Sequence, residues 1–412
     1  MRVKPAVVAC AADPTPSNAQ DVMSPEVYRL SVVQLLPPHG CAMSLRDKIP
    51  SVQAPTGAPL SVMRLLALTV VLYTFFVLYM KGALAFELFQ GDVVSYWNDS
   101  LTLATPYSTW WVPGYPAMIA SVRAATFGVL PPLAVMMLIA GSSYVIGVAV
   151  FALLASEAGI TSPREVSLLF AVHPFVGLTS AVYPDADSVA TALLLLCLLY
   201  YHREQWVSCA VFFGLMILTH KAIWFFALPL GVIAFIKHRE SRLPLVVASV
   251  PLLALIAAGA AHHNDILWAV RSSMKNLLTS QTSFFPVFDG IVASLIAGGF
   301  AKVSKVVLVL SALSLAGMLL LPCYRRRFWI GVSVAVGLLI MAVVVNRDNV
   351  WAIFRFSKVL LLPLGYVLLT PDSAFVRRWG GLTPIRFLLL SVGAIASNVA
   401  FGYYMAKIYF VR

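Results

Sequence analysis

Charged side chains are scarce in this sequence. Only 11% of the 412 residues are Asp, Glu, Lys or Arg, whereas 60% are hydrophobic. A soluble protein of this size needs more polar side chains to cover its surface, so that class is excluded. Short segments of alternating hydrophobicity, typical of membrane β-barrels, are also missing. We therefore expect an integral membrane protein built from helices.

Motifs of several common protein classes are absent as well. The chain has no glycine-rich phosphate loop with Lys and Ser or Thr, no zinc-protease histidine pair, and no glycine-flanked serine nucleophile. Its five cysteines are scattered, with neither metal-ligand spacing nor a disulfide pattern, and receive no function. Its two halves do not form repeats with broken helices, which counts against a secondary transporter.

The net charge of +12 does not indicate a nucleic-acid partner. Lys and Arg do not form one basic stripe with interleaved aromatic residues, which is the usual sign of nucleic-acid binding. They lie instead in short connections between apolar runs, as the positive-inside rule leads us to expect. No nucleic acid is expected among the partners.

Apolar runs long enough to cross a membrane recur from residue 62 onwards. We predict an all-α fold, a polytopic transmembrane helical bundle of about 11 spans, because a helix needs roughly 20 apolar residues to cross the hydrocarbon core. Residues 1–60 are rich in Pro, Ser and Ala, and we expect a disordered tail there. The predicted spans are 64–80, 131–154, 165–183, 187–201, 206–219, 222–236, 243–260, 302–321, 328–345, 357–370 and 386–405.

The basic connections at 237–242, 324–328 and 375–386 fix the predicted topology. The positive-inside rule assigns all three to the cytoplasm, and they agree because two spans separate each from the next. Residues 113–128 are ambiguous. Parity makes them an interfacial or re-entrant helix on the outer side; alternatively they cross the membrane and the N-terminal tail is external.

Polar groups gather on the predicted outer face. Counting spans places there a long first loop, the corner at 183–187, the turn after residue 219, and two further loops at 261–290 and 346–356. Ionisable groups that converge on one membrane face next to long loops indicate a functional site.

The first loop contains "GDVVSYW", in which Tyr96 follows Asp92 by four residues and would share its helical face. Asp92 is either the N-cap of a short amphipathic helix or a functional carboxylate, and the two roles are compatible. Asp99 stands farther from the aromatic cluster, and capping is the preferred interpretation for it.

The corner "YPDAD" places Asp185 and Asp187 at the start of a span. Asp185 is either a cap of this span or a functional carboxylate, because two carboxylates within one turn exceed what a cap requires. His173, inside the preceding span, is interpreted as a buried, hydrogen-bonded partner of the kink at Pro174.

Cationic groups on the same face could bind an anion. His220 and Lys221 end a span in "LTHK", where Lys221 either reaches the lipid headgroups or holds a substrate phosphate. Arg355 lies in or beside a short outer loop, against the usual charge bias, and is the residue we select for anion binding. "AHHND" at 261–265 lacks a third spaced ligand, so no metal is expected there.

Three stretches, "GDVVSYW" followed by "YSTWWVPGYP", then "HPFVGLTSAVYPDADSVATALLLL", then "GLMILTHKAIWFFALPL", resemble the GT-C superfamily of polytopic glycosyltransferases. The likeness covers about residues 64–240 and includes some similarity to mannosyltransferases. It implies a seven-helix module at 61–260 with an external loop at 81–130. A variable C-terminal set of spans would follow at 261–412, with an external loop at 261–290.

The resemblance also implies roles for individual residues. The first external loop of the family supplies an acidic catalytic base, which corresponds to Asp92. Asp185, with Asp187, matches an acidic corner, and Lys221, after His220, matches a basic position near the donor phosphate. Apart from the resemblance, Tyr96, Trp111 and Arg355 are also expected to bind substrate: Tyr96 shares the helical face of Asp92, Trp111 would border a groove for the lipid chain, and Arg355 would bind an anion. The family often carries two close acidic residues, whereas Val93 follows Asp92 here, so the need for Mg²⁺ or Mn²⁺ stays open.

The function expected from these observations is an inverting glycosyltransferase. It would move a sugar from a polyprenyl- or dolichyl-phosphate donor to a lipid or glycan acceptor at the outer face of a membrane, for which the short loops favour a bacterial inner membrane. Two alternatives stay open: a membrane transporter or lipid flippase, and a polymerase or ligase of surface polysaccharide.

Overall fold

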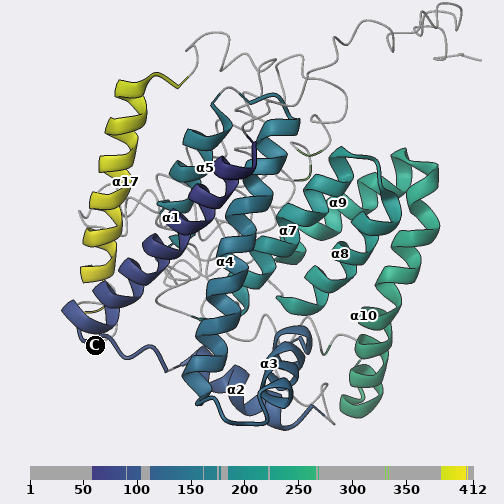
Figure 1. Ribbon diagram of the computed structural model, residues 1–412. Coiled ribbons are helices and arrows are strands. Elements are labelled where there is room, and N and C mark those ends of the chain that lie inside the picture. Colours follow the sequence, from purple (N-terminus) through teal and green to yellow (C-terminus); the bar gives the residue numbers. More distant parts are fainter. Residues whose placement is uncertain are drawn as a thin grey trace, which may run out of the picture. The chain divides into compact units, whose positions relative to one another are not determined.

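The computed structural model describes residues 58–89, 91–103, 112–160, 162–173, 176–177, 184–220, 223–265, 268, 330, 333, 382–404 and 406. All of them belong to one compact unit, Gly57–Arg412. The regular elements among them are ten α-helices, one π-helix and one 3₁₀-helix (Figure 1). This part of the chain is therefore all-α, as predicted.

Most of the helices coincide with predicted spans. The ends of α4, α7, α8, α9, α10 and α17 lie within a few residues of the predictions: Pro132–Glu157, Ala186–His202, Trp206–Thr219, Trp224–Lys237, Arg242–His263 and Pro384–Tyr404. Helix α1, Ala58–Leu78, begins earlier than the predicted residue 64 and includes the last residues of the predicted tail, the rest of which lies outside the described residues. Among the described residues, three segments are long and apolar enough to cross a membrane: Val62–Ala83, Pro132–Glu157 and Arg239–His263. The spans predicted at 302–321, 328–345 and 357–370 lie outside the described residues, except for Ile330 and Ser333.

One predicted span is interrupted. Helix α5 covers only Pro163–Ala171, whereas the prediction was a continuous run over 165–183. The break comes just before the His173–Pro174 pair. A proline disfavours helical geometry in the residue before it and has no N–H to continue the hydrogen-bond ladder, so it ends this helix early. Pro174 itself lies outside the described residues.

Helix α7 is the central element of the described bundle. It packs between α4 and α8, and α8 packs in turn against α10. Almost every residue of α7 is buried, which is expected for a helix that is apolar all round. Gly214 lets α8 approach α10 closely, because a Cβ there would lie 2.8 Å from the carbonyl oxygen of Ala248.

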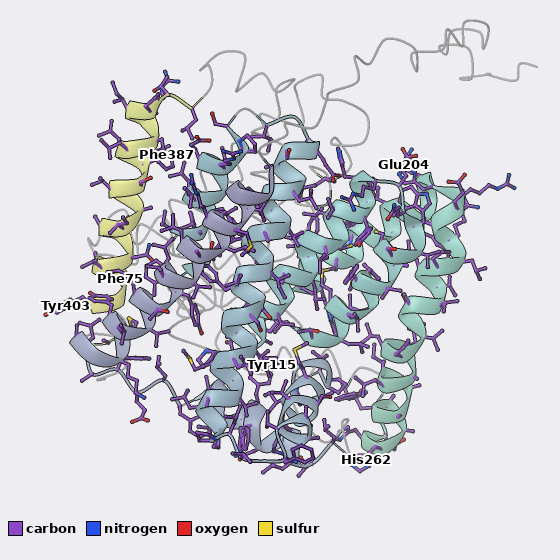
Figure 2. All side chains as sticks on the ribbon, in the orientation of Figure 1. Phe75, Tyr115, Glu204, His262, Phe387 and Tyr403 are labelled. Carbon is purple, nitrogen blue, oxygen red and sulfur yellow. The ribbon has the colours of Figure 1, made fainter. Side chains whose placement is uncertain are left out.

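The contacts divide the helix ends into two groups. At one end Arg203 pairs with Glu157, and the indole of Trp206 donates a hydrogen bond to Glu240. At the other end Tyr115 meets the start of α7. Figure 2 shows Glu204 far from Tyr115 and His262 along the helices. This is the grouping that span parity predicts; which end faces the cytoplasm stays a prediction.

Helix α17 joins elements that are distant in sequence. The π-helix η2, Tyr79–Ala83, continues α1, and the Tyr79 hydroxyl donates to the carbonyl of Val399 at 2.7 Å. The Asn398 amide donates to the carbonyl of Val172 at 2.5 Å, just after α5 ends. A Cβ on Gly402 would lie 2.7 Å from the Tyr79 ring, so glycine permits this contact.

Candidate functional site

Helix α2, Asp92–Leu101, is the short amphipathic helix predicted in the first loop. It buries Val93, Tyr96 and Ser100. Asp92 is not its N-cap, however. Gly91 occupies that position with φ 56° and ψ −126°, a conformation suited to glycine, and glycine has no side chain with which to cap the helix. Asp92 is the first helical residue, where its negative charge interacts favourably with the free N–H groups.

Helix α3, Gly114–Ala125, corresponds to the ambiguous segment at 113–128 and packs against α2. With 12 residues it is too short to cross a hydrocarbon core of about 30 Å, which favours the interfacial interpretation. The Tyr96 and Tyr115 rings meet edge to face, with centroids 5.0 Å apart. Both side chains are buried.

Tyr115 connects this pair of helices to the acidic corner. Its hydroxyl donates a hydrogen bond of 2.6 Å to the carbonyl of Pro184, the residue directly before Asp185. Burial, and then the nearby Asp185 carboxylate, raise the pKa of the Tyr115 phenol well above its usual value. The phenol therefore stays protonated and serves as a hydrogen-bond donor.

The corner itself begins helix α7 with two buried carboxylates. Asp185 is the N-cap, and its side chain accepts a hydrogen bond of 2.9 Å from the backbone N–H of Asp187. This confirms the capping role considered for Asp185. Asp187 faces the end of α8, with 3.3 Å between its Oδ1 and the Nε2 of His220. All three side chains are almost completely buried, so this polar cluster lies inside the protein.

Close packing of α3 against the last turn of α8 brings His220 to the corner. A Cβ on Gly114 would lie 2.5 Å from the carbonyl oxygen of Leu218 and 3.1 Å from the Cα of Thr219. Helix α8 ends at Thr219, and His220, the next residue, has an extended backbone. The Trp224 indole donates to the carbonyl of Ile217 at 2.7 Å and so satisfies one free carbonyl of that last turn.

This contact gives a test of the local geometry. Gly114→Ala is expected to lower stability by about 1–3 kcal/mol, because the new methyl group forces α3 away from a backbone carbonyl. In the control Gly147→Ala, the nearest atom would lie at 3.8 Å. That variant is expected to be stabilised by about 0.5–1 kcal/mol, since alanine favours a helix interior. Unfolding midpoints in detergent measure both; equal effects would contradict the close approach.

The structure thus gathers part of the predicted site. Tyr96, Asp185, Asp187 and His220 belong to one connected set, and Asp92 lies one helical turn before Tyr96. The remaining predicted residues, Trp111, Lys221 and Arg355, lie outside the described residues, although Lys221 directly follows His220 in the chain.

Two residues of the site were not predicted from the sequence. Tyr115 links the first loop to the corner, and Gly114 sets the distance between α3 and α8. Both belong to the quoted stretch "WVPGYP". A glycine and an aromatic residue between two prolines at the start of a short apolar helix are the signal that could have singled them out, because glycine permits close approach of two backbones.

Asp99 is a second acidic residue of α2. It lies inside this helix and not at its start, so the predicted capping role is wrong for it. It follows Asp92 by seven residues, so both lie on nearly the same side of the helix. Partial burial raises the pKa of the Asp99 carboxyl. Its Oδ2 atom is buried and makes no hydrogen bond within the part of the chain that the structure describes.

Within the described part of the chain, no group of three His, Cys, Asp or Glu side chains could hold a metal ion. His262 and His263 instead make ring contacts, with His263 stacked on Trp268 at 5.3 Å between centroids. The Trp268 indole donates to the carbonyl of Ile256 on α10. His262 and His263 are the last two residues of α10, and Trp268 packs against that helix. Comparison of the chain with family models, with curated proteins and with solved structures finds no match.

Proposed function

We propose that this protein is a membrane glycosyltransferase that uses a polyprenyl-phosphate-linked sugar as donor and inverts the configuration of the transferred sugar. The observation that carries the proposal is the junction at Tyr115. Through it, the stretches "GDVVSYW", "YPDAD" and "LTHK", which are far apart in the sequence, come together at one end of the helices. These are the stretches on which the resemblance to GT-C enzymes rests.

In the proposed reaction, a hydroxyl oxygen of the acceptor attacks the anomeric carbon of the sugar. Asp92 takes the hydroxyl proton, a general-base contribution of about 10²–10⁴ in rate. The bond between the anomeric carbon and the phosphate oxygen breaks, and its electron pair leaves with the lipid phosphate. A phosphate is a good leaving group and needs little protonation, so one carboxylate suffices, whereas glycosidases use two.

The other residues would hold the donor. Lys221 and Arg355 are proposed to neutralise the charge that develops on the departing phosphate. Asp185, Asp187 and His220 would hold the end of α8, after which Lys221 follows in the chain, because Asp187 and His220 join the start of α7 to the end of α8. Trp111 is proposed to border the path of the lipid chain. The reaction is placed at the outer face of a bacterial inner membrane, with a lipid or glycan as acceptor.

The direct test uses purified protein in detergent with a short-chain polyprenyl phosphate that carries a radiolabelled hexose or pentose. Release of free polyprenyl phosphate together with a labelled product is expected. The same protein in liposomes separates this function from lipid flipping. Movement of the labelled lipid between leaflets without any glycosylated product would overturn the proposal and favour a flippase.

Tyr115→Phe tests the junction itself. The variant leaves the buried carbonyl of Pro184 without this donor, which costs about 1–3 kcal/mol of stability. Donor affinity is also expected to fall, because the corner at Asp185 loses its link to α3. Tyr144→Phe is the matched control, since the Tyr144 hydroxyl makes a similar bond of 2.7 Å to the carbonyl of Ala171, outside the site.

Both tyrosine variants are expected to lower the unfolding midpoint by similar amounts, while only Tyr115→Phe raises the KM for the donor. If the two variants lowered stability and transfer equally, Tyr115 would be a structural residue without any special connection to the site.

A further inference from the structure

The corner between α3 and α4 exposes large apolar side chains. Phe127 is 93% exposed and Val129 is 80% exposed. Single exposed apolar residues are common on proteins, but two such side chains in a short connection form a tip that water solvates poorly. No carboxylate lies nearby in sequence: residues 114–156 contain one charged side chain, Arg123.

The backbone of the corner is unusual for a phenylalanine. The N–H of Gly128 bonds to the carbonyl of Arg123, and the N–H of Phe127 bonds to that of Ala124, which is the Schellman arrangement at a helix end. This arrangement puts Phe127 in the left-handed region with φ 50°, where glycine is the usual residue. Neither backbone preference nor packing within the described residues therefore accounts for a phenylalanine here.

The neighbouring helix indicates what surrounds this tip. Helix α4 starts at Pro132, five residues after Phe127, and is long and apolar enough to cross a membrane. Its lateral surface exposes Leu138, Ile146 and Leu153. Its 26 residues extend about 39 Å at about 1.5 Å each, somewhat more than a hydrocarbon core of about 30 Å. The corner at its start then lies at the boundary between headgroups and acyl chains.

Two residues on the preceding helices, Arg123 and Trp97, have side chains that favour the membrane–water interface. The Arg123 guanidinium lies over the Trp97 ring, 5.9 Å from its centroid, and so joins the end of α3 to α2. Arg123 precedes Phe127 by four residues, one helical turn. Tryptophan and arginine favour the headgroup level, whereas phenylalanine favours the region just below it.

We infer that the corner Phe127–Val129 is a membrane wedge that inserts into the phospholipid leaflet beside the start of α4, with Arg123 and Trp97 at the headgroup level. The wedge fixes α3, and with it Tyr115, at the membrane surface. This function of the corner does not depend on which reaction the protein catalyses. It depends on α4 crossing the membrane.

Nitroxide labels test the wedge in the full chain. Phe127→Cys and Val129→Cys are labelled in a background in which the five native cysteines are replaced, then reconstituted in phosphatidylcholine vesicles containing some phosphatidylglycerol. Asn98→Cys, on the exposed side of α2, is the aqueous control, and Ile146→Cys on α4 is the lipid control. Labels at 127 and 129 are expected to collide with oxygen more often than with a water-soluble nickel chelate, as at 146.

If labels at 127 and 129 collided with the nickel chelate as often as the label at 98, the inference would be overturned.

A second variant separates the wedge from a purely structural role. Phe127→Gly keeps the left-handed conformation accessible, so the unfolding midpoint in detergent is expected to stay equal or rise. When Phe127→Gly is combined with a nitroxide label at residue 129, the label is expected to collide with the nickel chelate several-fold more often in vesicles. Unchanged accessibility at 129 would show that Phe127 does not insert the corner.

Discussion

Asp92→Asn is expected to lower the rate of sugar transfer by about 10²–10⁴, because an amide cannot accept the proton of the acceptor hydroxyl. Asparagine has nearly the same shape as aspartate, and the side chain stays on the first residue of α2. Removal of the charge also weakens the interaction with the helix dipole, at a cost of about 0.3–1 kcal/mol. Transfer is therefore measured under saturating donor and acceptor with matched amounts of folded protein.

Asp99→Asn is the matched control for this experiment. It removes a carboxylate from the same helix and nearly the same side, two turns farther on. Burial already raises the pKa of the Asp99 carboxyl, so loss of its charge is expected to leave the unfolding midpoint equal or higher at neutral pH. Transfer should stay within a few-fold of the unmodified protein. The opposite result, with Asp99→Asn inactive and Asp92→Asn active, would assign the base to Asp99.

Asp187→Leu is expected to lower the free energy of unfolding by about 3–5 kcal/mol, the usual cost of removing one member of a buried polar pair. Asp187 and His220 are 3% and 4% exposed, and their contact joins the first turn of α7 to the end of α8. In the variant, His220 loses the carboxylate that faces it while it stays in a poorly solvated position. Denaturant titration in mild detergent measures the change.

Two further variants make this measurement specific. The double variant Asp187→Leu, His220→Phe replaces both partners with apolar groups and is expected to recover part of the stability. Glu157→Gln weakens the pair with Arg203, whose side chains are 28% and 32% exposed, and should cost at most about 1 kcal/mol. If Asp187→Leu cost no more than Glu157→Gln, the buried pair would not hold the two helices together.

The helices were largely predictable because each is a long apolar run bounded by polar residues or proline. Helix α8 begins and ends at the predicted residues 206 and 219, between "HREQ" and "HK". A kink was expected at His173–Pro174, but the prediction continued the helix to residue 183, whereas α5 ends at Ala171. Hydropathy alone does not show this end, because it does not detect that proline lacks a backbone N–H donor.

The sequence predicted which residues belong to the site better than it predicted which of them contact one another. Asp185, Asp187 and His220 stood out as ionisable groups at the ends of apolar runs, which is a local property. The bond from Tyr115 to Pro184 joins residues 69 positions apart, and apolar periodicity shows which face of a helix is buried but not which helix it meets. Trp111, Lys221 and Arg355 stay predictions.

The attachment of α17 bears on the order of biogenesis. Asn398 and Gly402 occupy positions beside Val172 and Tyr79, which the ribosome translates more than two hundred residues earlier. These two contacts can therefore form only after residues 398–402 have been synthesised, so α1 and α5 complete their packing with the last described helix of the chain.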